Sequence, residues 1–229
     1  MEQQALELPV ANRQDFSSFI PCSGNQSALQ FCQRILDQTS IEQVLYLYGA
    51  SGSGKTHLLQ ALADAAGVPR HRASALPETI FEQDYPILVI DALEELPDAP
   101  TQRGLVWELF NRYYTEGKKI VLAGQLAPKE LPTIDDHLKS RLLWGLVAHL
   151  DISDDPSRRM LISKLARDRN VIVPDAVADW LLTVLPRHAG ALIAALDRLY
   201  RCALKDNRRI TLPFARTVFL DTDESRLID

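Results

Sequence analysis

The sequence has few cysteines, no excess of positive charge and no long hydrophobic run. Its three cysteines, Cys22, Cys32 and Cys202, form no CxxC pair and no Cys/His ligand pattern, which argues against a disulfide framework or a cysteine zinc site. Lysine and arginine number 25 against 30 acidic residues, giving a net charge of −5, so we do not expect a protein that grips duplex DNA mainly by itself. No apolar run approaches the roughly 18 residues of a membrane span, and the N-terminus lacks the basic start of a signal peptide. These absences predict a cytoplasmic protein with reduced thiols and no membrane partner.

The composition that remains is that of a globular protein with one or two domains. Apolar residues make up 46% of the 229 residues and charged residues 24%. Strand-like and helix-like segments alternate in the first two thirds of the chain, and this alternation predicts an α/β fold with a parallel, doubly wound sheet. We expect strands at residues 44–48, 71–74, 87–90 and 119–124, and helices at residues 27–37, 55–66 and 105–116.

The pattern becomes almost entirely helical after about residue 150. Asp155-Pro156 is a typical helix start, and further helices are expected at residues 175–185 and 189–204. We therefore divide the chain into an extended tail, an α/β nucleotide-binding domain and a small helical domain. Their expected ranges are residues 1–15, 16–150 and 151–229.

A glycine-rich loop between a strand and a helix fits the phosphate-binding pattern G-x-x-x-x-G-K-[ST]. Its glycines let backbone N–H groups turn toward phosphate oxygens, the lysine reaches the β- and γ-phosphates, and the threonine hydroxyl ligates Mg²⁺. The positive end of the following helix points at the same anion. The loop predicts binding of ADP or ATP; the alternative is a glycine-serine loop beside a surface lysine. Its residues are Gly49, Ala50, Ser51, Gly52, Ser53, Gly54, Lys55 and Thr56.

An acidic residue at the end of a second buried strand complements this loop. Asp91 follows residues 87–90 and is expected to contact Mg²⁺ together with Thr56, although an aspartate at a strand end also caps turns. The next residue is Ala92, which cannot activate a water molecule. Glu94 and Glu95 are expected to face solvent, with the alternative that one of them reaches into the site, and slow or absent hydrolysis is expected from the isolated protein.

Six segments carry a resemblance that extends over nearly the whole chain. They are DFSSF at residues 15–19 with Asn25, YGASGSGKTHLLQ at 48–60, LVID at 88–91, LFNR at 109–112, APKEL at 127–131 and LKSRLLWG at 138–145. Together they resemble the DnaA/Hda family of bacterial AAA+ proteins, and the stretch from residue 128 to residue 145 is more specific than the generic phosphate loop. The resemblance implies an AAA+ core followed by a helical lid.

The resemblance also implies roles for single residues. Arg141 matches the arginine finger, which reaches a nucleotide held by a neighbouring subunit; the alternative is a solvated helix arginine. Gln125 occupies the sensor-1 position, where the family usually has Asp or Asn. The sensor-2 arginine maps to Gly190, so its contact with the γ-phosphate is in doubt, and Arg187 is the nearby candidate to replace it.

Two further sites are implied by the resemblance. His57, which follows the phosphate loop, is a further candidate for nucleotide binding. Phe19, Ile20 and Asn25 match the adenine region, although ordinary packing explains these three almost equally well. The tail is similar to the short peptide with which Hda-type members bind the replicative sliding clamp, with the glutamine displaced by one position; an incidental aliphatic tail is the alternative. The clamp-binding candidates are Gln4, Leu6, Leu8, Pro9 and Val10.

The expected function that follows from the resemblance is regulatory. The protein would hold nucleotide, bind the DNA polymerase III sliding clamp (its β subunit), reach DNA indirectly through the clamp, and present Arg141 to ATP bound by DnaA. The DNA-binding domain of the initiator is not expected after the lid, and a homo-oligomer is left open. The rivals are a DNA-handling ATPase such as a helicase loader or transposition helper, a nucleotide-binding scaffold and, least favoured, a small-molecule kinase.

Overall fold

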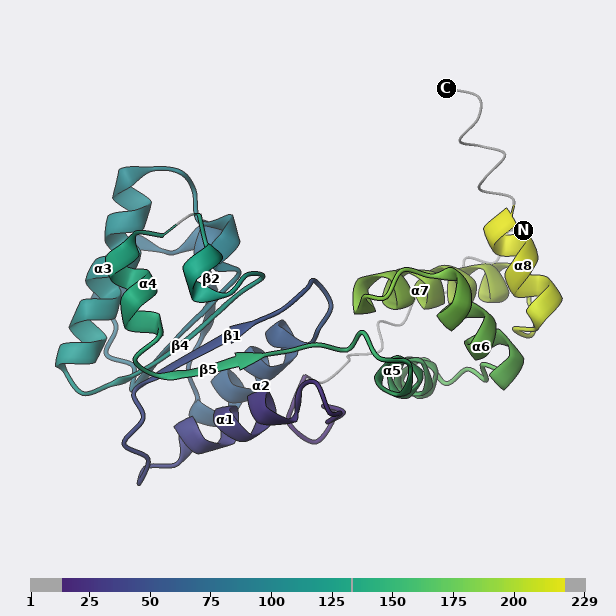
Figure 1. Cartoon of the computed structure of the whole chain (residues 1–229), viewed down its shortest axis with the longest axis horizontal. Coiled ribbons are helices and arrows are strands. Elements are labelled where there is room, and N and C mark those ends of the chain that lie inside the picture. Colours follow the sequence, from purple (N-terminus) through teal and green to yellow (C-terminus); the bar gives the residue numbers. More distant parts are fainter. Residues whose placement is uncertain (1–13, 133, 221–229) are drawn as a thin grey trace, which may run out of the picture.

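A five-stranded parallel sheet forms the centre of the first part of the chain. The computed structural model describes residues 14–132 and 134–220, and its sheet has the strand order β2-β3-β4-β1-β5 (Figure 1). The strands are β1 (Val44–Tyr48), β2 (Arg70–Arg72), β3 (Ile87–Asp91), β4 (Lys119–Gly124) and β5 (Leu146–His149). Because all pairs are parallel, the C-terminal ends of the three central strands β3, β4 and β1 meet at one edge.

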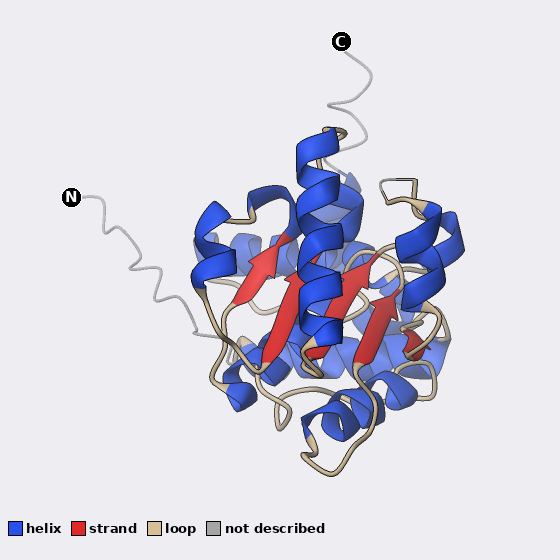
Figure 2. Ribbon diagram, turned by 90° about the vertical axis from the view of Figure 1, so that its left-hand side faces the viewer, coloured by secondary structure: helices blue, strands red, loops and turns tan. Residues whose placement is uncertain are grey.

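Helices cover both faces of this sheet (Figure 2). One apolar core joins α1 and α2 to the sheet, and a second joins α3 and α4 to the opposite face. The central strands are buried on both sides, which explains their continuous apolar runs. The helices of these two layers are α1 (Gln26–Leu36), α2 (Lys55–Ala66), α3 (Pro100–Thr115) and α4 (Asp136–Leu142).

The last part of the described chain is helical and has a core of its own. Arg158 is fully buried there and donates to the carbonyl oxygens of Leu182 (3.0 Å) and Leu185 (3.2 Å), so it caps the end of one helix from another. The helices of this region are α5 (Asp155–Asp168), α6 (Asp175–Val184), α7 (Ala189–Lys205) and α8 (Leu212–Leu220). In the described residues, no helix is both long and apolar enough to cross a membrane.

The structure confirms the expected fold class and corrects several details. The prediction ended the sheet at residues 119–124, but β5 follows as an edge strand beside β1. It missed α4 and α8, and it began α3 too late, since this helix starts at Pro100 with proline in its first turn. The short 3₁₀ turns 73–75, 78–82, 93–95 and 128–130 were also not foreseen.

Candidate functional site

The glycine-rich loop connects β1 to α2 at the C-terminal edge of the sheet. Gly52 has φ 78° and Gly54 has φ 104°, conformations that residues with a side chain rarely adopt. A Cβ on Gly52 would meet the backbone nitrogen of Gly190 at 2.7 Å, and one on Gly54 would meet the Phe19 ring at 3.0 Å. The glycines therefore permit the turn and also the close approach of α7 to the loop.

Lys55 begins α2 and is almost entirely enclosed by the loop. Its Nζ donates to the carbonyl oxygens of Gly49 at 2.6 Å and of Ala50 at 2.9 Å, and its relative exposure is 7%. Burial lowers the pKa of Lys55, while the nearby carboxylates of Glu94 and Asp91 act in the opposite direction. The ammonium group is thus held by neutral carbonyls that an anion can replace.

Thr56 and Asp91, both expected to contact Mg²⁺, are in direct contact. The Thr56 hydroxyl donates to Asp91 Oδ2 at 2.8 Å, and the Ala92 N–H donates to Asp91 Oδ1 at 2.9 Å. Arg70 of β2 was not foreseen in this site, yet its Nη1 lies 3.0 Å from the same Oδ2. The hydroxyl and the carboxylate are hard oxygen donors of the kind that suit Mg²⁺, so Thr56 and Asp91 fit the ion, with Arg70 as an added positive charge.

Contrary to the expectation from the sequence, Glu94 does not face solvent. It is half-buried, and its Oε2 accepts a hydrogen bond from the backbone N–H of Gln125 at 3.0 Å. Ala92 has φ 58°, a left-handed conformation, and this turn directs the chain after Asp91 back toward β4. Only Glu95 is exposed, where it pairs with Arg72.

Gln125 follows β4, whose C-terminal end lies between those of β1 and β3. It is therefore placed between the loop and Asp91 in the sheet order, although its side chain is exposed. Its backbone, rather than its amide, makes the contact with Glu94.

A cavity of about 350 Å³ opens beside the loop, within the size range of small-ligand sites. His57 lines it, and its Nε2 lies 2.9 Å from the Asp15 carbonyl and its ring 5.3 Å from that of Phe19. Burial lowers the pKa of His57, which favours the neutral ring. Ile20 also lines the cavity, whereas the Asn25 amide is occupied in bonds with the Ile20 oxygen (3.1 Å) and the Cys22 nitrogen (2.7 Å) and shapes the cavity wall.

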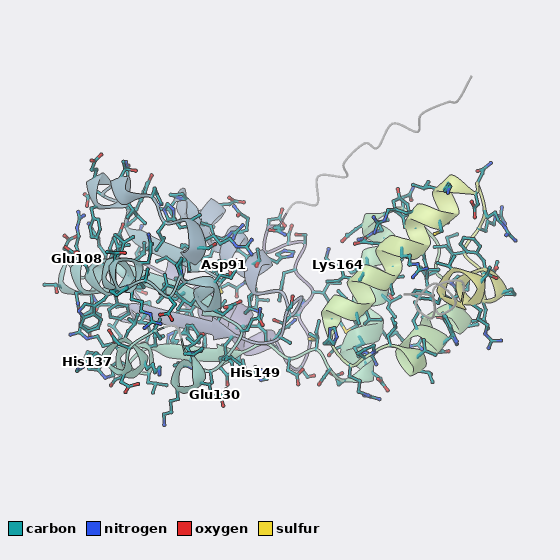
Figure 3. The ribbon with its side chains drawn as sticks, turned by 90° about the horizontal axis from the view of Figure 1, so that it is seen from above. Asp91, Glu108, Glu130, His137, His149 and Lys164 are labelled. Atoms are coloured by element: carbon teal, nitrogen blue, oxygen red, sulfur yellow. The ribbon has the colours of Figure 1, made fainter. Side chains whose placement is uncertain are left out.

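The helical region closes the other side of this cavity. Lys164 of α5 and Arg169 at its end both line it, each paired with an aspartate, Asp168 and Asp197 respectively. Figure 3 shows Asp91 at the end of the sheet nearest the helical region, and Lys164 at the side of that region nearest the sheet. The sequence analysis did not identify Lys164 and Arg169 as site residues. The only signal for Lys164 is its position between the apolar residues 161 and 165 on one helix face.

Neither the sensor-2 position nor its proposed substitute is among the residues that line this cavity. Gly190 sits at the start of α7, where the Ser51 carbonyl oxygen would lie 3.5 Å from an added Cβ. Arg187 is directed to Asp155, with 3.1 Å between Nη1 and Oδ1, and it lines a separate, smaller hollow.

Arg141 lies on α4, which packs on the sheet face opposite to α2. Figure 3 shows His137 of the same helix at the end of the molecule remote from the helical region. The Arg141 guanidinium stacks 4.6 Å from the Trp107 ring and 5.5 Å from the Trp144 ring, and Nη1 donates to Asn111 Oδ1. No carboxylate of the described residues lies within ion-pair distance of it. Within the described part of the chain, Arg141 is therefore a half-buried cation without a counter-ion. The tail candidates Gln4, Leu6, Leu8, Pro9 and Val10 lie outside the described residues.

The strand order, the glycine-rich loop after β1 and the acid after β3, followed by a helical region, define a P-loop protein of the AAA+ class. The family model of the bacterial DnaA ATPase domain matches residues 10–75 and 67–149, and that of the Hda lid domain matches residues 154–219. These matches cover more than half of the chain, which belongs to the DnaA/Hda family.

Solved structures agree with this fold. Domain III of Thermotoga maritima DnaA has a TM-score of 0.79 at 22% identity, over 93% of this chain and 98% of that one. AMPPCP-bound DnaA from Aquifex aeolicus has a TM-score of 0.71 at 23% identity over 84% of this chain, which spans 66% of that chain. The Thermotoga maritima RuvB Holliday junction branch migration motor is similar at 17% identity, with a TM-score of 0.69, over 91% of this chain and 72% of that one.

Proposed function

We propose that this chain binds ADP or ATP in the cavity beside the P-loop, as a regulator of a second AAA+ protein. Lys55, Thr56 and the start of α2 supply the phosphate contacts, and the apolar wall around Phe19 receives the base. Two of the similar DnaA structures hold AMPPCP, which supports a nucleotide in the corresponding place. The site lies within the predicted α/β domain (16–150), and the predicted helical domain (151–229) closes it.

Two positions of the site carry residues without a functional side chain. Ala92 offers no carboxylate to activate water, and Gly190 offers no cation to a γ-phosphate. A bound Mg²⁺ would neutralise phosphate charge at Thr56 and Asp91. We expect a protein that retains nucleotide and hydrolyses ATP slowly.

The observation that carries the regulatory function is the position of Arg141. It lies across the sheet from the P-loop helix, free of any ion pair in the described chain, and its guanidinium is held by two indole rings. A finger supplied to another subunit stabilises the charge that spreads over the phosphoryl oxygens in the transition state. We infer that Arg141 acts on ATP bound by DnaA.

The predicted partners are DnaA and the sliding clamp. The alternating apolar residues of the tail, Leu6, Leu8 and Val10, suit an extended peptide in an apolar groove. DNA takes part through the clamp that encircles it.

The test is a reconstituted hydrolysis assay with DnaA–ATP and clamp loaded on DNA. We expect the wild-type protein to accelerate conversion of DnaA-bound ATP to ADP, and Arg141→Ala to lose most of a factor of roughly 10³. Arg141→Lys is expected to recover little, because an ammonium group lacks the planar fork of the guanidinium. A truncation lacking residues 1–10 is expected to lose the dependence on the clamp.

Equal stimulation by Arg141→Ala and wild type would show that Arg141 is a surface residue. If neither protein stimulates hydrolysis, the scaffold function replaces the regulatory one. Binding of ADP, measured in parallel, verifies that each variant is folded.

A further inference from the structure

Arg70 shares the site of the P-loop acid although it lies on a different strand. It is the first residue of β2, at the edge of the sheet, and its register partner in β3 is Val89. Because alternate residues of a strand share a face, Arg70 and Asp91 project from the same side of the sheet. Their side chains meet with 3.0 Å between Nη1 and Oδ2.

The contact uses the carboxylate oxygen that Thr56 also contacts. Asp91 Oδ2 already accepts from the Thr56 hydroxyl, and Oδ1 accepts from the Ala92 N–H. Arg70 is itself fixed, because its Nε donates to Gln60 Oε1 of α2 at 3.0 Å. The guanidinium is therefore a built part of the site, held from both β3 and α2.

The charge balance of the site follows from this contact. The Asp91 side chain is 6% exposed and that of Arg70 is 24% exposed, so the pair is poorly screened by solvent. An arginine stays protonated at all physiological pH values, so the pair sums to zero charge and Asp91 attracts a cation less strongly than an unpaired carboxylate would. Ala92 supplies no second carboxylate to restore a net negative charge.

We propose that Arg70 is a permanent counter-ion of Asp91 and that the protein consequently binds a nucleoside diphosphate with little dependence on Mg²⁺. The inference rests on the proposed nucleotide site. Lys55 and the loop N–H groups provide the phosphate contacts, and the Thr56–Asp91 hydrogen bond is kept by Arg70 when no metal is present.

The experiment is titration of the whole chain with ADP, by calorimetry, in excess Mg²⁺ and in excess EDTA. For the wild type we expect the two dissociation constants to agree within about threefold, which is a small difference in binding free energy. In Arg70→Gln the negative charge of Asp91 is released, and we expect Mg²⁺ to tighten ADP binding by about tenfold or more.

Two matched variants separate charge from structure. Arg72→Gln removes the exposed arginine of the same strand, which pairs with Glu95, and should keep the wild-type ratio. Arg70→Lys retains the positive charge and should also keep the wild-type ratio of the two dissociation constants.

A wild-type protein that binds ADP about tenfold more tightly with Mg²⁺ overturns the proposal, whatever the variants do. An unchanged ratio in folded Arg70→Gln overturns it as well. Failure to bind ADP in either condition would instead refute the proposed nucleotide site, on which the inference rests.

Discussion

Lys55 and Arg141 are both held away from free solvent, but in opposite ways. Lys55 is enclosed at the end of the sheet by the carbonyl oxygens of its own loop, beside a cavity that the helical region closes. Arg141 lies on the other sheet face between Trp107 and Trp144, and Trp144 is 60% exposed. One cation faces a pocket of this chain, and the other faces outward.

The difference indicates what each cation can reach. Carbonyl oxygens hold an ammonium group until an anion enters the pocket, so the surroundings of Lys55 suit a ligand bound by the same chain. Aromatic rings fix the plane of a guanidinium and leave its edge accessible. Arg141 is thus oriented for a carboxylate or phosphate brought by another molecule.

The aromatic support of Arg141 can be removed without touching the pocket. Trp107→Ala is expected to lower the stimulation of DnaA-bound ATP hydrolysis by roughly tenfold, because a cation–π contact of about 1–2 kcal/mol then no longer orients the guanidinium. Trp107→Phe keeps an aromatic face and should recover most of the rate. The assay of hydrolysis by DnaA measures both, with ADP affinity as the control.

Unchanged stimulation by Trp107→Ala would mean that the rings only pack against α4. A loss of ADP affinity in the same variant would mean that the two ends of the molecule are not independent.

The cavity beside the P-loop can be examined by thiol labelling of the cysteines, for which we expect a smaller effect than for Trp107→Ala. Cys22 lines the cavity and is half-buried, whereas burial raises the pKa of the fully enclosed Cys32 to about 12. In the native protein at neutral pH, Cys32 should stay unmodified by a thiol reagent, since the thiolate is the reactive form. Saturating ADP should slow labelling of Cys22 several-fold and leave Cys202 of α7 unchanged.

Mass spectrometry of the labelled peptides follows all three sites in one sample. Equal protection of Cys22 and Cys202 would argue for a general tightening of the molecule instead of a ligand in the cavity.

The sequence predicts those parts of the site that follow from a contiguous motif or from a clear strand pattern. The P-loop is one contiguous motif, and Thr56 and Asp91 meet because the buried strands that position them have clear apolar runs. The alternation of strands and helices was sufficient for the fold class. The edge strand β5 was missed because it is only four residues long and has a single buried residue, Ala148.

The contacts that the sequence did not predict depend on distant pairings or on an unusual turn. Arg70 reaches Asp91 only through the pairing of β2 with β3, and Lys164 reaches the cavity only through closure by α5. Glu94 turns inward because Ala92 adopts a left-handed conformation. Alanine rarely adopts this conformation, so the sequence gives no sign of the turn.

The most direct test of the division between the two cations is ADP affinity, measured by calorimetry on Lys55→Ala and Arg141→Ala side by side. We expect Lys55→Ala to weaken binding by about tenfold to a hundredfold, because it removes a charge-assisted bond to phosphate. Arg141→Ala should bind ADP within about twofold of the wild type. Loss of ADP affinity in Arg141→Ala, or normal affinity in Lys55→Ala, would contradict the account.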